Sequence, residues 1–212
     1  GEIIGLQGSS GSGKSTLINL ILGFLKPDSG KISVDNNDID LNYLKTSDWK
    51  KKFSYVPQSV YLFDESIKYN ITLEDDEKKI DNNSLEISIK LACLDKFILE
   101  RNSGIESKIG EKGLKISGGE KQRIGIARAL YRNSQIYIFD EATNSLDGLT
   151  EKIIMEAIEE LGGQKTIVMI AHRLKTIEKC DMIFFIDKGQ MVDHGTYQEL
   201  IKSNKDFKKL AS

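Results

Sequence analysis

The chain has 212 residues, 39% of them hydrophobic and 29% charged, which is enough for one large domain or one domain with an inserted lobe. Its 30 basic and 32 acidic residues give a formal charge of −2, so there is no electrostatic basis for non-specific nucleic-acid binding. No apolar run reaches the roughly 18 residues that a membrane span needs. Two distant cysteines, Cys93 and Cys180, favour a reduced, cytosolic protein.

The first predicted elements are a buried strand over Glu2 to Gln7 and a helix over Lys14 to Phe24. The loop between them, Gly8-Ser9-Ser10-Gly11-Ser12-Gly13-Lys14-Ser15-Thr16, matches the phosphate-binding pattern G-x-x-x-x-G-K-[ST]. Glycines let successive backbone N–H groups point into one concavity, where the helix N-terminus and Lys14 add positive charge. The Ser15 hydroxyl can bind Mg²⁺. A flexible Gly/Ser linker is the alternative, but the flanking strand and helix favour a phosphate site.

Further along, short strands are predicted over Lys31 to Val34 and Phe53 to Val56. From about Gln58 to Ser134 the pattern changes. Leu73 to Ser84 is polar and is expected to face solvent, whereas Ile87 to Leu99 has helical apolar spacing. We therefore expect a mainly helical lobe inserted into an α/β core.

The core resumes with an unbroken apolar strand, Ile136 to Phe139. The later predicted elements are a helix over Glu151 to Leu161, strands over Thr166 to Ile170, Met182 to Ile186 and Gln190 to Val192, and a closing basic helix from Tyr197 to about Leu210. This alternation predicts an α/β fold with a mostly parallel sheet. His194 is expected in a turn. Gly1 directly precedes a strand predicted to be central in the sheet, so we expect further strands upstream.

Two carboxylates, Asp140 and Glu141, follow the apolar strand Ile136 to Phe139. Ligands of open α/β sheets bind beyond the carboxyl ends of the strands. In an enzyme with a phosphate loop, the first carboxylate can hold Mg²⁺, and the second can orient and deprotonate a water molecule. A solvated acidic pair is the alternative, and the presence of the phosphate loop argues for the functional interpretation.

The segment Ile116-Ser117-Gly118-Gly119-Glu120-Lys121-Gln122-Arg123 predicts a helix start. Ser117 and Glu120 have the spacing of a capping box. Each of the two glycines in the first turn costs about 1 kcal/mol relative to alanine. That cost has a purpose if bare backbone N–H groups must approach an anion closely, although an ordinary helix start is equally compatible with these residues.

Together these motifs resemble ATP-binding cassette (ABC) proteins. The phosphate loop corresponds to Walker A, Ser117 to Glu120 to the signature, and Ile136 to Glu141 to Walker B. Three further matches complete the set and extend the resemblance over essentially the whole chain: Gln58 resembles the Q-loop, Ser145-Leu146-Asp147 the D-loop, and His172 the switch histidine. Alone, Gln58 and His172 would be interpreted as structural residues. Ile109 to Gly113 resembles the X-loop of exporters. Two longer stretches, Tyr55 to Ile71 and His172 to Leu200, also resemble the sequences of exporters.

The resemblance implies a P-loop NTPase core over about 1–57 and 135–212, a helical lobe over about 58–134, and ATP with Mg²⁺ as ligands. It implies catalytic roles for Lys14, Gln58, Glu141 and His172, with Glu141 as the general base. Mg²⁺ would be held by Ser15, Gln58 and Asp140. The nucleotide-binding residues would be Gly8 to Thr16 together with Ser117, Gly118, Gly119, Glu120 and Asp147. Of these, Ser117, Gly118 and Gly119 would act on ATP held by a second cassette, and Asp147 would lie at the interface with it.

The first implied partner is a second cassette, expected to be another copy of this chain, in a head-to-tail dimer. The second is a transmembrane domain, contacted near Gln58 and Ile109 to Gly113. Nucleic acid is not expected as a partner. The implied location is the cytoplasmic face of the cell membrane, with the fragment itself soluble.

A DNA-repair or translation ABC ATPase is the alternative, but the coiled coils or paired cassettes of those proteins are absent from this sequence. A non-hydrolysing scaffold is disfavoured by Glu141 and His172. Two departures stand out: the signature has Ile116 and Glu120 for the usual Leu and Gln, and the aromatic residue that stacks on adenine is expected before Gly1.

Overall fold

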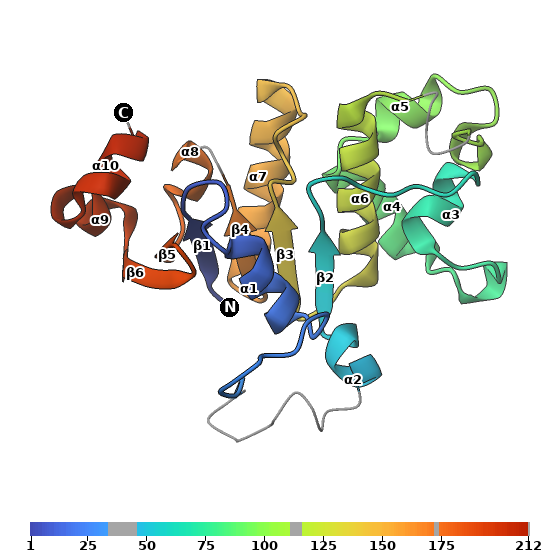
Figure 1. Ribbon diagram of the computed structural model, residues 1–212. Coiled ribbons are helices and arrows are strands. Elements are labelled where there is room, and N and C mark those ends of the chain that lie inside the picture. The colour runs from blue at the N-terminus through green and yellow to red at the C-terminus, as the bar shows by residue number, and fades with distance from the viewer. Residues whose placement is uncertain (34–45, 111–115, 172–173, 212) are drawn as a thin grey trace. The chain divides into compact units, whose positions relative to one another are not determined.

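The computed structural model describes residues 1–33, 46–110, 116–171 and 174–211 of the chain. The described residues form a six-stranded sheet with the strand order β2-β3-β4-β1-β5-β6 (Figure 1). The strands are β1 (Ile3–Gln7), β2 (Phe53–Val56), β3 (Ile136–Asp140), β4 (Thr166–Ile170), β5 (Met182–Asp187) and β6 (Gln190–Gly195). Strand β1 pairs in parallel with both β4 and β5, and β6 runs antiparallel to β5. The predicted α/β fold is therefore confirmed, with β1 in a central position.

Helices lie between most of these strands and after the last one. They are α1 (Lys14–Ile21), α2 (Thr46–Lys51), α3 (Ile67–Thr72), α4 (Asn82–Leu91), α5 (Asp95–Leu99), α6 (Gly118–Arg132), α7 (Gly148–Gly162), α8 (Leu174–Ile177), α9 (Tyr197–Ser203) and α10 (Lys205–Ala211), with the 3-10 turns η1 (Glu77–Lys79) and η2 (Gly104–Glu106). The chain divides into two compact units. Unit 1 comprises Gly1–Phe53, Ser134–Ile138 and Lys165–Ser212, and unit 2 comprises Ser54–Asn133 and Phe139–Gln164. The predicted boundaries of a core and an inserted lobe stay a prediction.

Unit 1 is built on the pairing of β1 with its two parallel neighbours. Ile167 of β4 and Ile183 of β5 are fully buried, and Leu6 of β1 is nearly so. Helices α9 and α10 lie together beside β6 (Figure 1). There Phe207 of α10 is fully buried and packs edge-to-face on Phe185 of β5, with ring centroids 5.7 Å apart. This aromatic contact anchors the C-terminal helices to the sheet.

Unit 2 is organised around α6, against which α3 and α4 pack (Figure 1). Ile124 and Ile126 of α6 are fully buried. Gly125 lies between them, and a Cβ added there would come within 2.5 Å of a methyl carbon of Val60. The small residue thus allows the chain after β2 to pack directly on the helix backbone, which fixes the segment that contains Gln58.

Several predicted elements differ from the structure. Lys31 to Ser33 form no regular element, and Val34 lies outside the described residues. The predicted helix Ile87 to Leu99 is two helices, because Cys93 between them has a left-handed backbone with φ 54°. The closing helix is interrupted at Asn204, whose backbone is extended and whose side-chain oxygen accepts hydrogen bonds from the N–H groups of Asp206 and Phe207. The placement of His194 in a turn was wrong, since it pairs with Phe184 inside the β5–β6 ladder.

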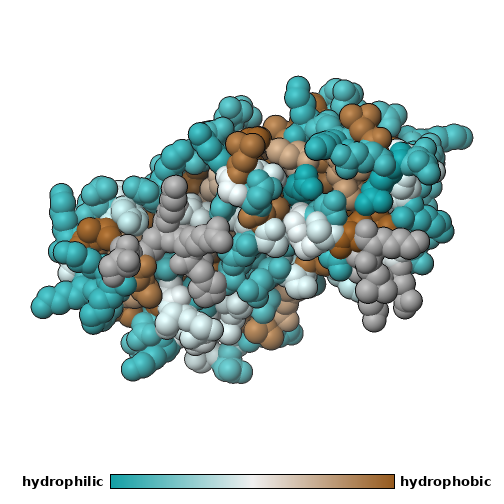
Figure 2. Space-filling model, turned by 90° about the horizontal axis from the view of Figure 1, so that it is seen from above, coloured by the Kyte–Doolittle hydropathy of each residue, from teal (hydrophilic) through white to brown (hydrophobic). Residues whose placement is uncertain are grey.

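Among the residues that the structure describes, no helix has the length and apolar character required to cross a bilayer. On the face shown in Figure 2, hydrophobic side chains form several small, separate patches among hydrophilic ones.

Candidate functional site

The phosphate loop of unit 1 connects the end of β1 to the start of α1, and its backbone tolerates only glycine at two positions. A Cβ on Gly8 would lie 2.1 Å from the carbonyl oxygen of Ile186, and Gly13 has a φ of 105°. A Cβ on Gly11 would meet no atom within 4 Å, so the loop is open on that side. The N–H of Gly189 donates to the carbonyl of Ser12 at 2.8 Å, which ties the loop to the β5–β6 turn.

Lys14 begins α1 and curls back over the loop. Its side chain is held inside the loop, with the residue 7% exposed, and Nζ donates to the carbonyls of Gly8 at 2.8 Å and Ser9 at 3.0 Å. Ser15 and Thr16, the next two residues, are exposed at the helix start. An inward-held ammonium, an open glycine loop and a helix N-terminus together fit an anionic phosphate group.

The acidic part of the site, in unit 2, begins with Asp140 at the end of β3. The residue is 7% exposed, and its Oδ2 accepts a hydrogen bond of 3.1 Å from the hydroxyl of Tyr55 in β2. Burial raises the pKa of Tyr55 above its ordinary value, and the charge of Asp140 and this hydrogen bond raise it further. The hydroxyl therefore stays protonated and remains a donor throughout the neutral range.

Glu141, directly after β3, has a left-handed backbone with φ 53°, a conformation that is unfavourable for residues other than glycine. Its Oε2 accepts hydrogen bonds from the side-chain amides of Gln58 at 2.6 Å and Asn144 at 3.0 Å. Strained backbone of this kind persists where the surroundings hold a residue for function. Because Gln58 donates through Nε2, its Oε1 atom is left to bind a cation, which fits the predicted role in Mg²⁺ binding.

The signature forms the capping box that its sequence predicts. Ser117 Oγ accepts from the N–H of Glu120 at 3.2 Å, and Glu120 Oε2 accepts from the N–H of Ser117 at 2.6 Å. The Ser145 hydroxyl donates to the carbonyl of Gly118 at 3.4 Å, and a Cβ on Gly119 would lie 3.0 Å from the carbonyl oxygen of Ser145. The predicted D-loop therefore packs directly on the start of α6.

Asp147, the last residue of the predicted D-loop, caps the N-terminus of α7. Its Oδ1 accepts a hydrogen bond of 3.0 Å from the N–H of Thr150, and hydrogen bonding to Thr150 holds the pKa of Asp147 below its ordinary value. The carboxylate is thus charged at neutral pH, and the residue is exposed.

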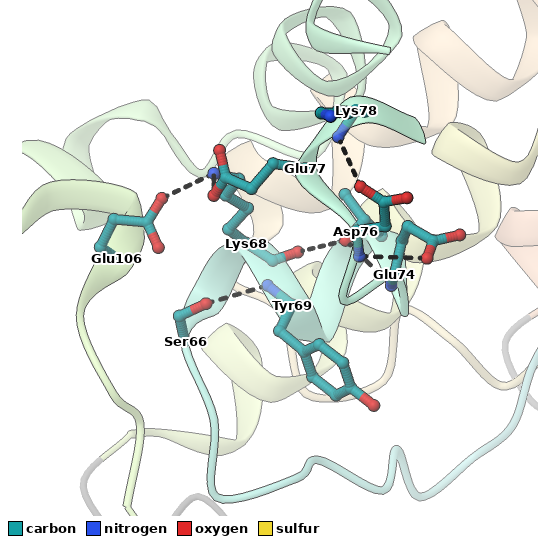
Figure 3. Close-up of polar contacts among 9 residues, drawn as sticks. Ser66, Lys68, Tyr69, Glu74, Asp76, Glu77, Lys78 and Glu106 are labelled. Atoms are coloured by element: carbon teal, nitrogen blue, oxygen red, sulfur yellow. Dashed lines mark hydrogen bonds and ion pairs between the residues drawn. The ribbon is translucent and has the colours of Figure 1, made fainter. Parts of the chain in front are cut away.

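The chain leading to the signature is fastened to the chain following Gln58. The N–H of Ile67 donates to the carbonyl of Ser107, and the N–H of Ile109 to that of Glu65. Beside this pairing, Lys68 donates to Glu77 at 2.6 Å and to Glu106 at 2.9 Å (Figure 3). Its side chain is only 15% exposed. These contacts join α3, η1 and η2 into one piece of unit 2.

The predicted site residues fall into these two groups. The phosphate loop belongs to unit 1, and Gln58, Asp140, Glu141, the signature and Asp147 belong to unit 2. His172 and residues 111–113 of the predicted X-loop lie outside the described residues. Sequence reasoning missed Tyr55, Asn144 and Lys68. Asn144 has a local signal, since an asparagine three residues after Glu141 can turn its amide back, whereas the partners of Tyr55 and Lys68 are distant in sequence.

Comparison with known proteins agrees with this geometry. Residues 1–144 match the model of the ABC transporter family. The chain is 41% identical over 210 residues to an ATP-dependent lipid A-core flippase of Vibrio parahaemolyticus, and 39% identical over 209 residues to a putative export ATP-binding/permease protein of Rickettsia prowazekii. Both alignments cover 99% of this chain and 36% of the relative.

Among solved structures, a bacterial Atm1-family ABC exporter with ATP bound matches with a TM-score of 0.92 and 34% identity, over 99% of this chain and 36% of that one. The chain therefore spans about a third of the length of these proteins. The match extends from the phosphate loop through the C-terminal helices, so the P-loop NTPase fold is confirmed. The chain belongs to the ABC transporter family and is a nucleotide-binding domain of that family.

Proposed function

We propose that this domain binds ATP with Mg²⁺ and hydrolyses it to power export, or flipping, of a substrate by a transmembrane part of the same transporter. The observation that carries the proposal is the phosphate loop, in which glycines that no other residue can replace surround an inward-held Lys14. The exporter relatives support the transport role and disfavour a function in DNA repair or translation.

In this proposal the phosphate loop holds the triphosphate through its backbone N–H groups and Lys14. Ser15, Gln58 and Asp140 would hold Mg²⁺, and their hydroxyl, amide and carboxylate oxygens are the hard ligands that this ion prefers. Bound Mg²⁺ supplies neutralisation of charge on the phosphate oxygens. The chain's own contribution is positioning, because phosphoryl transfer requires little covalent chemistry from the protein.

Glu141 acts as the general base for the attacking water. In this role the carboxylate, which two amide hydrogen bonds at Oε2 hold in place, would accept a proton from the water. The amides of Gln58 and Asn144 fix the orientation of the carboxylate. His172 is assigned to the γ-phosphate from the family resemblance.

A second cassette completes the site in a head-to-tail dimer. The start of α6, with Ser117, Gly118, Gly119 and the cap residue Glu120, presents N–H groups and a hydroxyl to ATP held by the partner. Asp147 lies at the same interface. The transmembrane partner is contacted near Gln58 and Ile109 to Gly113, and the domain works at the cytoplasmic face of the membrane.

Substitution of Lys14 and Glu141 tests the proposal. Lys14→Ala removes the charge from the loop, so Mg²⁺-ATP binding by the 212-residue chain should weaken at least about tenfold, as expected for loss of a charge-assisted hydrogen bond. Glu141→Gln keeps the amide contacts and removes the base, so it should retain ATP and abolish hydrolysis. Calorimetric titration and phosphate release measure the two effects.

The matched control is Lys26→Ala, which removes one exposed positive charge outside the loop. It should bind Mg²⁺-ATP like the original chain. ATP affinity of the Lys14→Ala variant equal to that of the Lys26→Ala control would overturn the assignment of the phosphate loop. Unchanged phosphate release by Glu141→Gln would move the base to another residue.

A further inference from the structure

A cavity of about 240 Å³ lies within unit 2, and none of the residues that line it is assigned to ATP or Mg²⁺ in the proposed function. Its walls come from β2, the end of α3 and the last turns of α6. Ile71, Leu73 and Ala129 supply apolar surface, whereas Arg128 and Tyr131 supply hydrogen-bond donors. The cavity therefore combines the two kinds of surface that sites for small molecules commonly have.

Arg128 lines this cavity with a guanidinium group whose hydrogen-bond partners are all neutral. Nε donates to the carbonyl of Asn70 at 2.7 Å, Nη1 to the carbonyl of Tyr61 at 3.1 Å, and Nη2 to the side-chain oxygen of Asn70 at 3.5 Å. A guanidinium has five N–H groups, so two of them have no acceptor among the described residues. Those residues also provide no carboxylate that forms an ion pair with Arg128.

The charge of Arg128 is therefore incompletely compensated. A buried cation is costly unless an opposite charge accompanies it. Burial lowers the pKa of Arg128, and no neighbouring charge in the described part of the chain shifts it back. The group still stays charged, because an arginine does not lose its proton in proteins. The Asn70 carbonyl, in the last turn of α3, offers only the partial negative charge of a helix C-terminus.

Tyr131 adds a second donor one helical turn after Arg128. Residues three positions apart on a helix lie on the same side, and both of these side chains line the cavity. The hydroxyl oxygen of Tyr131 accepts a hydrogen bond from the N–H of Asp81 at 3.2 Å. No described residue accepts the hydroxyl proton, which is left to donate to a ligand.

We propose that this cavity, the Arg128 pocket, binds a small organic anion in which a carboxylate is attached to a flat apolar ring. The carboxylate pairs with Arg128 and accepts from the Tyr131 hydroxyl, and the ring lies against Ile71, Leu73 and Ala129. A volume of about 240 Å³ is just below the usual range of about 300 to 1,000 Å³ for ligand sites, so one ring fits better than a nucleotide. The apolar walls offer no contact to inorganic phosphate.

The ligand chemistry is tested with four probes on the 212-residue chain, by NMR titration that follows the backbone amides of Leu73 and Ala129. Benzoate has both the ring and the charge, benzamide has the ring alone, and acetate and inorganic phosphate have the charge alone. Benzoate should saturate with a midpoint below about 2 mM. The other three should bind at least about tenfold more weakly, as expected when a charge-assisted hydrogen bond or the apolar contact is lost.

Two variants test the residues. Arg128→Gln removes the charge and should weaken benzoate at least about tenfold. Tyr131→Phe keeps the ring, removes one donor and should weaken benzoate several-fold. The matched control is Arg123→Gln, because Arg123 lies on the same helix and also donates to a backbone carbonyl, that of Cys93, but does not line the cavity. It should bind benzoate like the original chain.

Thermal melting first establishes that each variant is folded. If Arg128→Gln is not, the comparison of benzoate with benzamide and the titration of Tyr131→Phe decide the question. A benzoate midpoint above about 2 mM, or equal binding of benzoate and benzamide, overturns the proposal. Acetate or phosphate binding as tightly as benzoate overturns the role of the ring. Equal weakening in Arg128→Gln and Arg123→Gln overturns the assignment to this cavity.

Discussion

Glu120 carries a charge at a position where the family pattern has an amide. Its carboxylate does not point away from the helix but accepts from the N–H of Ser117 at 2.6 Å. In return the N–H of Glu120 donates to Ser117 Oγ, so the hydroxyl proton of Ser117 is left to donate to a phosphate oxygen of the partner's ATP in the proposed dimer. Glu120 thus prepares the contact residue rather than making the contact itself.

Replacement of Glu120 tests this role. Glutamine also completes a capping box, so Glu120→Gln should leave the free energy of unfolding within about 0.5 kcal/mol of the original. Glu120→Ala removes the acceptor and should lower it by about 1 kcal/mol, as loss of a cap typically does. Urea denaturation measures both. A glutamine variant as unstable as the alanine variant would show that the negative charge, not the hydrogen bond, stabilises the helix start.

At the scale of elements, Lys68 joins three short pieces that could not hold their positions by themselves. Helix α3 has six residues, and η1 and η2 are single turns. The ammonium bridges Glu77 of η1 and Glu106 of η2 (Figure 3). In addition, the backbone N–H of Ile67 donates to the carbonyl of Ser107. The chain from α3 to Ile109 is therefore held by one connected network.

The pH dependence of a Lys68→Met variant tests this network. Hydrogen bonds to Glu77 and then Glu106 raise the pKa of Lys68, so its stabilising effect is fully present below the ordinary lysine pKa of about 10.4 and is lost as pH rises through the higher folded value. The stability deficit of Lys68→Met should be constant from pH 7 to 9 and should shrink above about pH 10.5.

The matched control is Lys78→Met, a substitution of an exposed lysine in η1. It should cause a smaller deficit in urea denaturation than Lys68→Met at pH 7. Equal deficits for the two variants, or a Lys68→Met deficit that grows at alkaline pH, would contradict a role for Lys68 as the tie between η1 and η2.

At the scale of the whole molecule, the sequence predicted the parts that depend on short patterns. The phosphate loop, Asp140-Glu141 and the capping box are each specified by adjacent residues, and the alternation of strands and helices indicated the sheet. Contacts set by strand pairing could not be predicted, and Tyr55 with Asp140 is the main example. The breaks at Cys93 and Asn204 depend on single backbone conformations that neither residue type dictates, because tertiary packing overrides weak local preference.

The proposed dimer predicts that a charge at the start of α6 acts on the partner's nucleotide. Gly118 is the suitable position, since a Cβ there would lie 3.8 Å from that of Ser145, whereas Gly119 has only 3.0 Å to a carbonyl oxygen. The carboxylate introduced by Gly118→Asp would interact favourably with the positive end of the α6 dipole but would repel the phosphate groups of a nucleotide. In a Glu141→Gln background, Gly118→Asp should leave the ATP affinity of the monomer within about twofold of the Glu141→Gln parent. It should abolish the dimer that forms with Mg²⁺-ATP.

Analytical ultracentrifugation measures the dimer. Gly163→Asp serves as control, because a Cβ at Gly163 meets no atom within 4 Å and the new side chain can be accommodated there. That control should dimerise like the parent. If Gly118→Asp forms as large a fraction of dimer as the parent, the start of α6 is not part of the dimer interface. Loss of monomer binding would instead mean that the signature acts on the nucleotide of its own subunit.

The left-handed backbone at Glu141 has an evolutionary consequence. With φ 53°, a residue other than glycine is disfavoured there by about 1 to 2 kcal/mol, so the backbone conformation by itself does not favour a glutamate at this position. In the proposed function, selection for turnover would be the force that keeps a glutamate there. When a gene copy is released from that selection, drift to glycine or asparagine should be tolerated by the backbone, and the resulting silent cassettes should persist as well-folded proteins.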